Sequence, residues 1–172
     1  LGVISDLGPH AIDLVRWMLG DVTEVTAFAR TTISERPDPG SGRARQVTNH
    51  DDADVQLAAQ SGATASLTIS RVAPDTGVPG GITIEVLGDA GWIRVDSNEP
   101  DVVIGTASGI ERRPVPVRSF QDGAGAQIGD FVRVARGEHV DGLPSIDDGY
   151  QAQLVMDAVA RSLDARESIH LG

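Results

Sequence analysis

The sequence predicts an α+β domain built on a largely antiparallel sheet. Segments with strand-like patterning follow one another through short turns, and helical periodicity is confined to the two ends of the chain. This order favours antiparallel pairing over alternating βαβ units. The length of 172 residues, with 40% hydrophobic and 23% charged residues, is typical of one soluble globular domain. No internal repeat or domain boundary is evident.

The first element is predicted to be a helix. Its apolar residues recur at helical spacing, namely Ala11, Leu14, Val15 and Met18. Gly20 is a typical helix end. Because Pro9 has no backbone donor, the helix either begins near Pro9 or starts near Gly2 and is disturbed at Pro9.

Extended segments follow this helix. Val22 to Ile33 is rich in β-branched residues and predicts a strand, whereas Ser34 to His50, with two prolines and two glycines, predicts a surface loop. Two hairpins are then expected around glycine-containing turns. They comprise Asp54 to Ala59 with Ala63 to Val72, and Ile82 to Leu87 with Trp92 to Val95, joined by a loop from Pro74 to Gly81.

The last third of the chain predicts two more strands and two helices. The strands are Val102 to Ile104 and Arg113 to Val117, of which the second carries two prolines and is therefore expected at a sheet edge. Helical period resumes over Gln127 to Ala135 and again over Asp147 to Ala165. Ser145 to Asp148 resembles a capping box for the last helix.

Composition excludes several classes of function. The formal charge of −11 and the 3% aromatic content disfavour nucleic-acid and membrane-surface partners. The chain has no cysteine and no lysine, so thiolate chemistry and any lysine-dependent step would need another domain. Neither a long apolar run nor a signal peptide is present, and the missing initiator Met suggests a piece of a longer protein. A cytoplasmic location is expected.

The densest cluster of reactive side chains is Asp6, His10 and Asp13. On a helix these positions fall on one side, so a carboxylate lies within reach of an imidazole. A carboxylate beside a histidine suits general acid/base chemistry near neutral pH. The alternative from spacing alone is a helix cap at Asp6, a partly buried His10 and a solvated Asp13.

The pattern Asp6-x-Gly8-x-His10-x-x-Asp13 before an apolar helix resembles the start of the C-terminal domain of the Gfo/Idh/MocA oxidoreductases, which include glucose-fructose oxidoreductase and inositol dehydrogenases. Further segments match in the same order along nearly the whole chain. These are Asp51-Asp52 with the hairpin around Gly62, Val86 to Ile93, Phe131 to Gly137, Pro144 to Gly149, and Asp157 to Val159 with Ser162.

The resemblance implies an antiparallel open sheet with helices on one face and residues 1–172 forming a single substrate-binding and oligomerisation domain. It implies an NAD or NADP cofactor bound mainly by an N-terminal Rossmann domain that is absent from this chain, and a sugar, inositol or related polyol as substrate. By position, His10 would move the substrate proton and Asp6 would be its partner, together with a lysine from the other domain. The open sheet face would join copies into a homo-oligomer. The isolated 172-residue fragment is expected to be inactive.

Alternatives to this enzyme role remain open. The domain could be a non-catalytic ligand-binding or dimerisation module, or a metal-binding protein that uses the cluster from His50 to Asp54. The glycine run from Gly123 to Gly129 lacks the flanking strands of a dinucleotide site, so no cofactor-binding residue and no metal ligand is assigned. Arg71 is interpreted as a solvated edge residue, Tyr150 is ambiguous, and His139 and His170 are expected at the surface.

Overall fold

The computed structural model describes residues 2–73, 81–115 and 120–172. The chain divides into two compact units, one made of Leu1–Ala73 with Pro144–Gly172 and the other of Pro74–Leu143. The sequence indicated no boundary at either position, because strand patterning continues on both sides of Pro74 and helical patterning on both sides of Pro144. Most of the loop expected at Pro74 to Gly81, and the expected strand end at Pro116 and Val117, lie outside the described residues.

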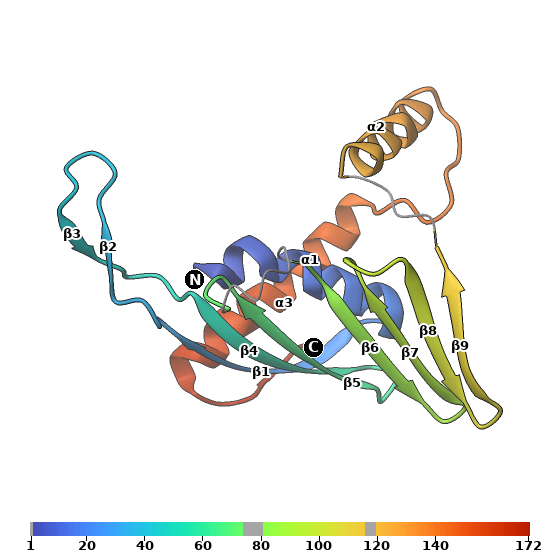
Figure 1. The fold of residues 1–172 in the computed structure, drawn as a ribbon, viewed down its shortest axis with the longest axis horizontal. Coiled ribbons are helices and arrows are strands. Elements are labelled where there is room, and N and C mark those ends of the chain that lie inside the picture. The colour runs from blue at the N-terminus through green and yellow to red at the C-terminus, as the bar shows by residue number, and fades with distance from the viewer. Residues whose placement is uncertain (1, 74–80, 116–119) are drawn as a thin grey trace. The chain divides into compact units, whose positions relative to one another are not determined.

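The first unit is a four-stranded sheet with two helices on one face (Figure 1). The strand order is β10-β1-β4-β5, and all neighbours are antiparallel. The strands are β1 (Val22–Arg30), β4 (Asp52–Ala59), β5 (Thr64–Ser70) and β10 (Ile169–His170), and the helices are α1 (Val3–Leu19) and α3 (Ile146–Ala165). The predicted fold class is confirmed, whereas the short strand β10 was not anticipated.

The core of this unit lies between the sheet and the two helices. Alternate sheet residues such as Val25 and Val55 are almost fully buried against helix residues such as Ile12 and Val159. Ser162 is buried among them at 0% exposure. Its hydroxyl accepts a hydrogen bond from the backbone N–H of Ala27 and donates one to the carbonyl of Glu167. Both bonds keep this polar group satisfied, which removes the cost of burying it.

Helix α1 begins at Val3 and contains Pro9, which confirms the earlier of the two predicted starts. The backbone N–H of Val3 donates to the carbonyl of His50 at 2.9 Å. Gly2 has φ +58°, and a Cβ at that position would lie 2.1 Å from the same carbonyl oxygen. Only glycine fits here, so the start of α1 is fixed against residue 50.

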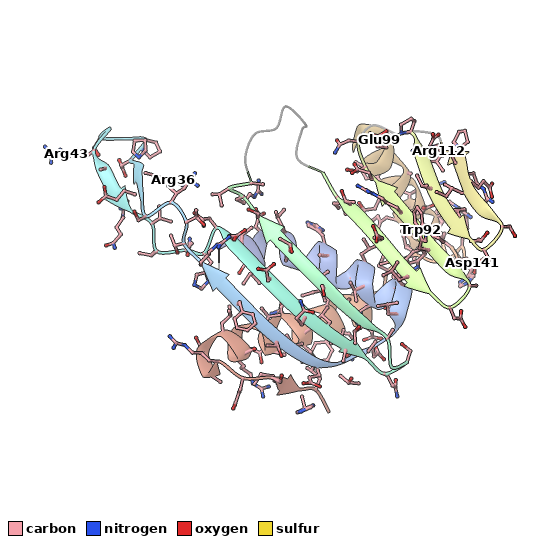
Figure 2. The ribbon with its side chains drawn as sticks, turned by 60° about the horizontal axis from the view of Figure 1, so that its bottom comes forward. Arg36, Arg43, Trp92, Glu99, Arg112 and Asp141 are labelled. Atoms are coloured by element: carbon pink, nitrogen blue, oxygen red, sulfur yellow. The ribbon has the colours of Figure 1, made fainter. Side chains whose placement is uncertain are left out.

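The segment from Ser34 to His50, predicted as a loop, instead contains a small hairpin. Its strands are β2 (Glu35–Pro37) and β3 (Ala44–Gln46), and every residue of both strands is exposed, including Arg36 (Figure 2). The Asp38 carboxylate accepts hydrogen bonds from the backbone N–H groups of Gly40 and Ser41 and closes the turn. The prediction was wrong because this local bonding, rather than burial, forms the hairpin.

The second unit contains an antiparallel meander of β6 (Thr83–Gly88), β7 (Gly91–Asp96), β8 (Asp101–Thr106) and β9 (Gly109–Pro114), followed by α2 (Phe120–Ala135). The predicted edge position is confirmed, since β9 is the last strand of the described sheet in the order β6-β7-β8-β9, although this strand begins four residues before the predicted Arg113. Helix α2 starts earlier than predicted and includes the run from Gly123 to Gly129. Among the described residues, no helix has the length and apolar character needed to cross a membrane.

One face of this meander carries a cross-strand row of Leu87, Trp92, Gly105 and Ile110. The Trp92 ring (Figure 2) covers Gly105, where a Cβ would lie 2.2 Å from the ring. Leu87 and Ile110 are 75% and 71% exposed. This row is therefore an apolar strip. No other described element of the unit packs extensively against the meander.

Candidate active site

Helix α1 carries the two predicted site residues, Asp6 and His10, with Asp13 of the same motif one turn further along. Asp6, His10 and Asp13 are spaced four and three residues apart within Val3–Leu19, so they lie along one side of the helix. Asp6 and His10 are exposed, and Asp13 is half-buried. The first two are therefore neither enclosed in the hydrophobic core nor turned to opposite surfaces.

His10 opens onto a hollow of about 230 Å³ between α1 and the start of α3. Polar groups of Asp13, Ser145 and Gln153 line it beside the imidazole. The rest of the lining is apolar or backbone, from Pro9, Pro144, Gly149, Ala152 and Met156. The lining thus combines a few hydrogen-bonding groups with an apolar surface. Ser145 was predicted only as a helix cap, and no sequence pattern pointed to Gln153.

Asp6 forms an ion pair with Arg71, the residue that follows β5. The Arg71 guanidinium donates to Oδ2 of Asp6, and each side chain is 56% exposed. In the described part of the chain no hydrogen bond or ion pair joins Asp6 directly to His10. Arg71 is thus a solvated residue at the end of β5, as interpreted from the sequence, and it also contacts a predicted site residue.

The backbone at residues 50 and 51 holds both partners of this ion pair. The carbonyl of His50 accepts from Val3 at the start of α1, and the carbonyl of Asp51 accepts from the N–H of Arg71 at 2.9 Å. Helix α1 and the end of β5 are therefore positioned on two consecutive residues. The Asp6–Arg71 contact follows from this shared attachment.

Asp51 is itself held by backbone donors. Its carboxylate accepts hydrogen bonds from the N–H groups of Thr32 and Ile33 at 2.6 and 2.9 Å, and Asp51 as a whole is buried, with 6% of its surface exposed. These hydrogen bonds stabilise the ionised form and lower the pKa of Asp51 below its ordinary value. The acidic cluster proposed as a metal site therefore uses this carboxylate to fix the backbone.

The rest of that cluster has structural partners as well. Asp52 pairs with Arg30 at 2.6 Å, and Asp54 accepts from the hydroxyl of Thr68 at 2.8 Å. Within the part of the chain that the structure describes, no group of three or more His, Asp or Glu side chains could hold a metal ion. Nδ1 of His50 is buried and has no hydrogen-bond partner among the described residues.

Replacing Asp51 with asparagine should change the pH dependence of stability. Because the folded-state pKa of Asp51 is lowered, its contribution to the free energy of unfolding is present above the unfolded pKa, near 3.8, and is lost as the pH falls below it. Asp51→Asn should therefore be less stable than wild type at neutral pH, with the difference shrinking between about pH 5 and pH 2. Urea unfolding at several pH values measures this. A difference that grows on acidification contradicts it.

The remaining candidates are not among the residues that line the hollow. His139 pairs with Asp141 in an exposed loop, His170 lies at the exposed end of β10, and Tyr150 is 59% exposed on α3. The glycine run lies inside α2 rather than between a strand and a helix, so it does not fit a dinucleotide phosphate.

Comparison with known proteins agrees with this fold. A family model described as "GFO/IDH/MocA C-terminal domain" matches residues 1–94, which contain α1, β1, β4, β5 and Arg71. The chain belongs to the GFO/IDH/MocA family. The predicted resemblance is confirmed, and the domain matched is the one with the Asp6 and His10 helix.

Relatives of this GFO/IDH/MocA domain are dehydrogenases. An inositol 2-dehydrogenase from Acidothermus cellulolyticus is 31% identical over 164 residues, covering 93% of this chain and 44% of that protein. A levoglucosan dehydrogenase from Pseudarthrobacter phenanthrenivorans is 27% identical over 202 residues, covering 97% and 50%. A levoglucosan dehydrogenase solved with NADH and levoglucosan has a TM-score of 0.83 at 25% identity, covering 99% and 50%. The chain spans about half the length of these relatives.

Proposed function

We propose that this chain is the C-terminal, substrate-binding domain of an NAD(P)-dependent dehydrogenase that acts on a sugar, inositol or related polyol. The observation that carries the proposal is the position of His10, which is exposed, lies on the rim of a mixed polar and apolar hollow, and has Asp6 one helical turn away. The named relatives act in this class of reaction: one is an inositol dehydrogenase and another a levoglucosan dehydrogenase.

In this proposal His10 is the general acid/base. Oxidation of a secondary alcohol removes the proton from the hydroxyl oxygen and a hydride from the carbon that bears this oxygen. The imidazole takes the proton during oxidation and returns it during the reverse reduction. Asp6 lies close enough along the helix to orient the ring or to bind a neighbouring hydroxyl. A nicotinamide cofactor held by the other domain would supply the hydride acceptor.

The cofactor would be held by another domain. The described residues offer no strand–turn–helix cradle, and the chain has no lysine to complete the family's acid/base set. We therefore propose that residues 1–172 form one domain beside an N-terminal Rossmann domain, in a cytoplasmic enzyme. The solved relative bound to NADH supports NAD as the cofactor type, while a choice of NADP would depend on the other domain.

We also propose that copies of the protein associate through the uncovered sheet faces. In the first unit the helices pack on one face, and Phe28 is 66% exposed on β1. In the second unit the strip of Leu87, Trp92 and Ile110 lies on an open face. Exposed apolar side chains of this kind are typical of surfaces that become buried on association.

The test is turnover by the complete gene product that contains this chain. The protein should reduce NAD or NADP, followed by absorbance at 340 nm, with at least one member of a panel of inositols, anhydrosugars and aldoses. The 172-residue chain alone should give no turnover, because it lacks the cofactor cradle and the lysine.

Three results would overturn the proposal. Turnover by the isolated chain contradicts the assignment of the cofactor to another domain. A complete gene product without an upstream dinucleotide-binding sequence favours the non-catalytic module instead. A complete protein that binds NADH but oxidises or reduces no member of the panel contradicts the substrate class.

A further inference from the structure

We infer that Arg71 is a positioning residue that fixes the carboxylate of Asp6 for its work beside His10. This inference rests on the proposed function, since it concerns the same acid/base pair. Its basis is the Asp6–Arg71 ion pair, which links helix α1 to the end of β5. Nothing in the sequence pattern distinguishes Arg71 from an ordinary edge arginine.

The ion pair is set by backbone attachments on both sides. Val3, three residues before Asp6, donates to the carbonyl of His50, and Arg71 donates through its own N–H to the carbonyl of Asp51. Asp51 is in turn held by the N–H groups of Thr32 and Ile33. The two side chains are thus attached to one rigid stretch of backbone, unlike two long side chains that meet by chance on a surface.

The contact with Arg71 also gives the two carboxylate oxygens of Asp6 different surroundings. Arg71 donates to Oδ2, and no donor among the described residues is bonded to Oδ1. With Oδ2 occupied, the carboxylate loses rotational freedom and presents Oδ1 to a substrate hydroxyl or to the imidazole of His10, one turn further along α1. Fixing a group before the reaction lowers the barrier, because less ordering is needed in the transition state.

A positioning role and a purely structural role of Arg71 predict effects of different size on stability and on the reaction rate. An ion pair with both side chains 56% exposed contributes little to stability. Loss of Arg71 should therefore leave the unfolding midpoint almost unchanged. A misplacement of about 1 Å at a catalytic group, by contrast, can reduce a rate by about 10²-fold.

The experiment measures steady-state kinetics of the complete enzyme with Arg71→Met, Arg71→Lys, Asp6→Asn and the double variant Asp6→Asn/Arg71→Met. We expect Arg71→Met to lower kcat by about 10-fold to 100-fold with KM changed little, and Arg71→Lys to recover part of the loss. The double variant should lose no more than Asp6→Asn alone, because Arg71 acts through Asp6. The matched control is Arg113→Met, which removes an ion pair with Glu111 of similar exposure, 62% and 58%, in the other unit.

Failure of this inference can be told from failure of the proposed function. If wild type is active and His10→Ala is not, but Arg71→Met keeps full kcat, Arg71 has no positioning role. If Arg71→Met raises KM and its effect adds to that of Asp6→Asn, Arg71 contacts the substrate directly and the inference is wrong. If wild type oxidises no polyol, the proposed function itself fails, and the inference falls with it.

Discussion

Replacing His10 with alanine in the complete enzyme is expected to lower kcat/KM by about 10²-fold or more, the usual consequence of losing a general acid/base. His10 is exposed at the rim of the hollow, and its imidazole takes part in no hydrogen bond within the described part of the chain, so removal of this side chain should leave the fold intact. Steady-state kinetics in both directions, with circular dichroism to check folding, measure the effect.

The matched control for this variant is His139→Ala. His139 is 88% exposed and pairs with Asp141 in the second unit, whereas Asp6 and His10 belong to the first unit. Its kcat/KM should equal that of wild type. A loss of less than about threefold for a folded His10→Ala enzyme would remove His10 from the mechanism.

Ile12→Ala is expected to lower the free energy of unfolding by about 2–5 kcal/mol, as removal of a buried isoleucine does when a cavity remains. Ile12 is 1% exposed and belongs to the core between the sheet and the two helices of the first unit. Urea unfolding of the chain followed by far-ultraviolet circular dichroism measures the loss. Because α1 carries Asp6 and His10 as well, this variant should also weaken the site.

Trp17→Ala on the same helix is the comparison for Ile12→Ala. Trp17 is 78% exposed although it is a large apolar residue. Its removal should change the free energy of unfolding by no more than about 0.5 kcal/mol, as surface substitutions do. Equal losses for the two variants would mean that α1 packs differently from the arrangement described above.

Regular hydrophobic patterning made most of the fold predictable. Helix α3 was expected from Asp147 and begins at Ile146. The predicted capping box is present, with Ser145 as the N-cap and Asp148 as its partner. Strands β4 and β5 were expected within two residues of their bounds. In these elements local propensity, turn residues and burial favour the same structure, so one sequence is enough to predict them.

The strands that the sequence failed to predict are those without a pattern of alternating buried and exposed residues. The hairpin of β2 and β3 is exposed on every residue and is closed by Asp38, so it has no apolar alternation to detect. Strand β10 has only two residues, and it forms because β1 offers a free edge at Glu24 and Val25. Pairing of such short segments depends on a distant partner that the local sequence does not reveal.

Periodicity and motif spacing along the chain were enough to predict the helix with Asp6 and His10 on one side, the antiparallel strands, and the resemblance to the GFO/IDH/MocA family. The ion pair of Asp6 with Arg71, 65 residues away, and the place of Gln153 of α3 in the lining of the same hollow as His10 became visible only in the folded chain. The two sets of features differ in the range of the interactions that produce them. Periodicity along a chain records which face of an element is buried, whereas contacts between distant elements depend on how the backbone at His50 and Asp51 brings α1 and β5 together.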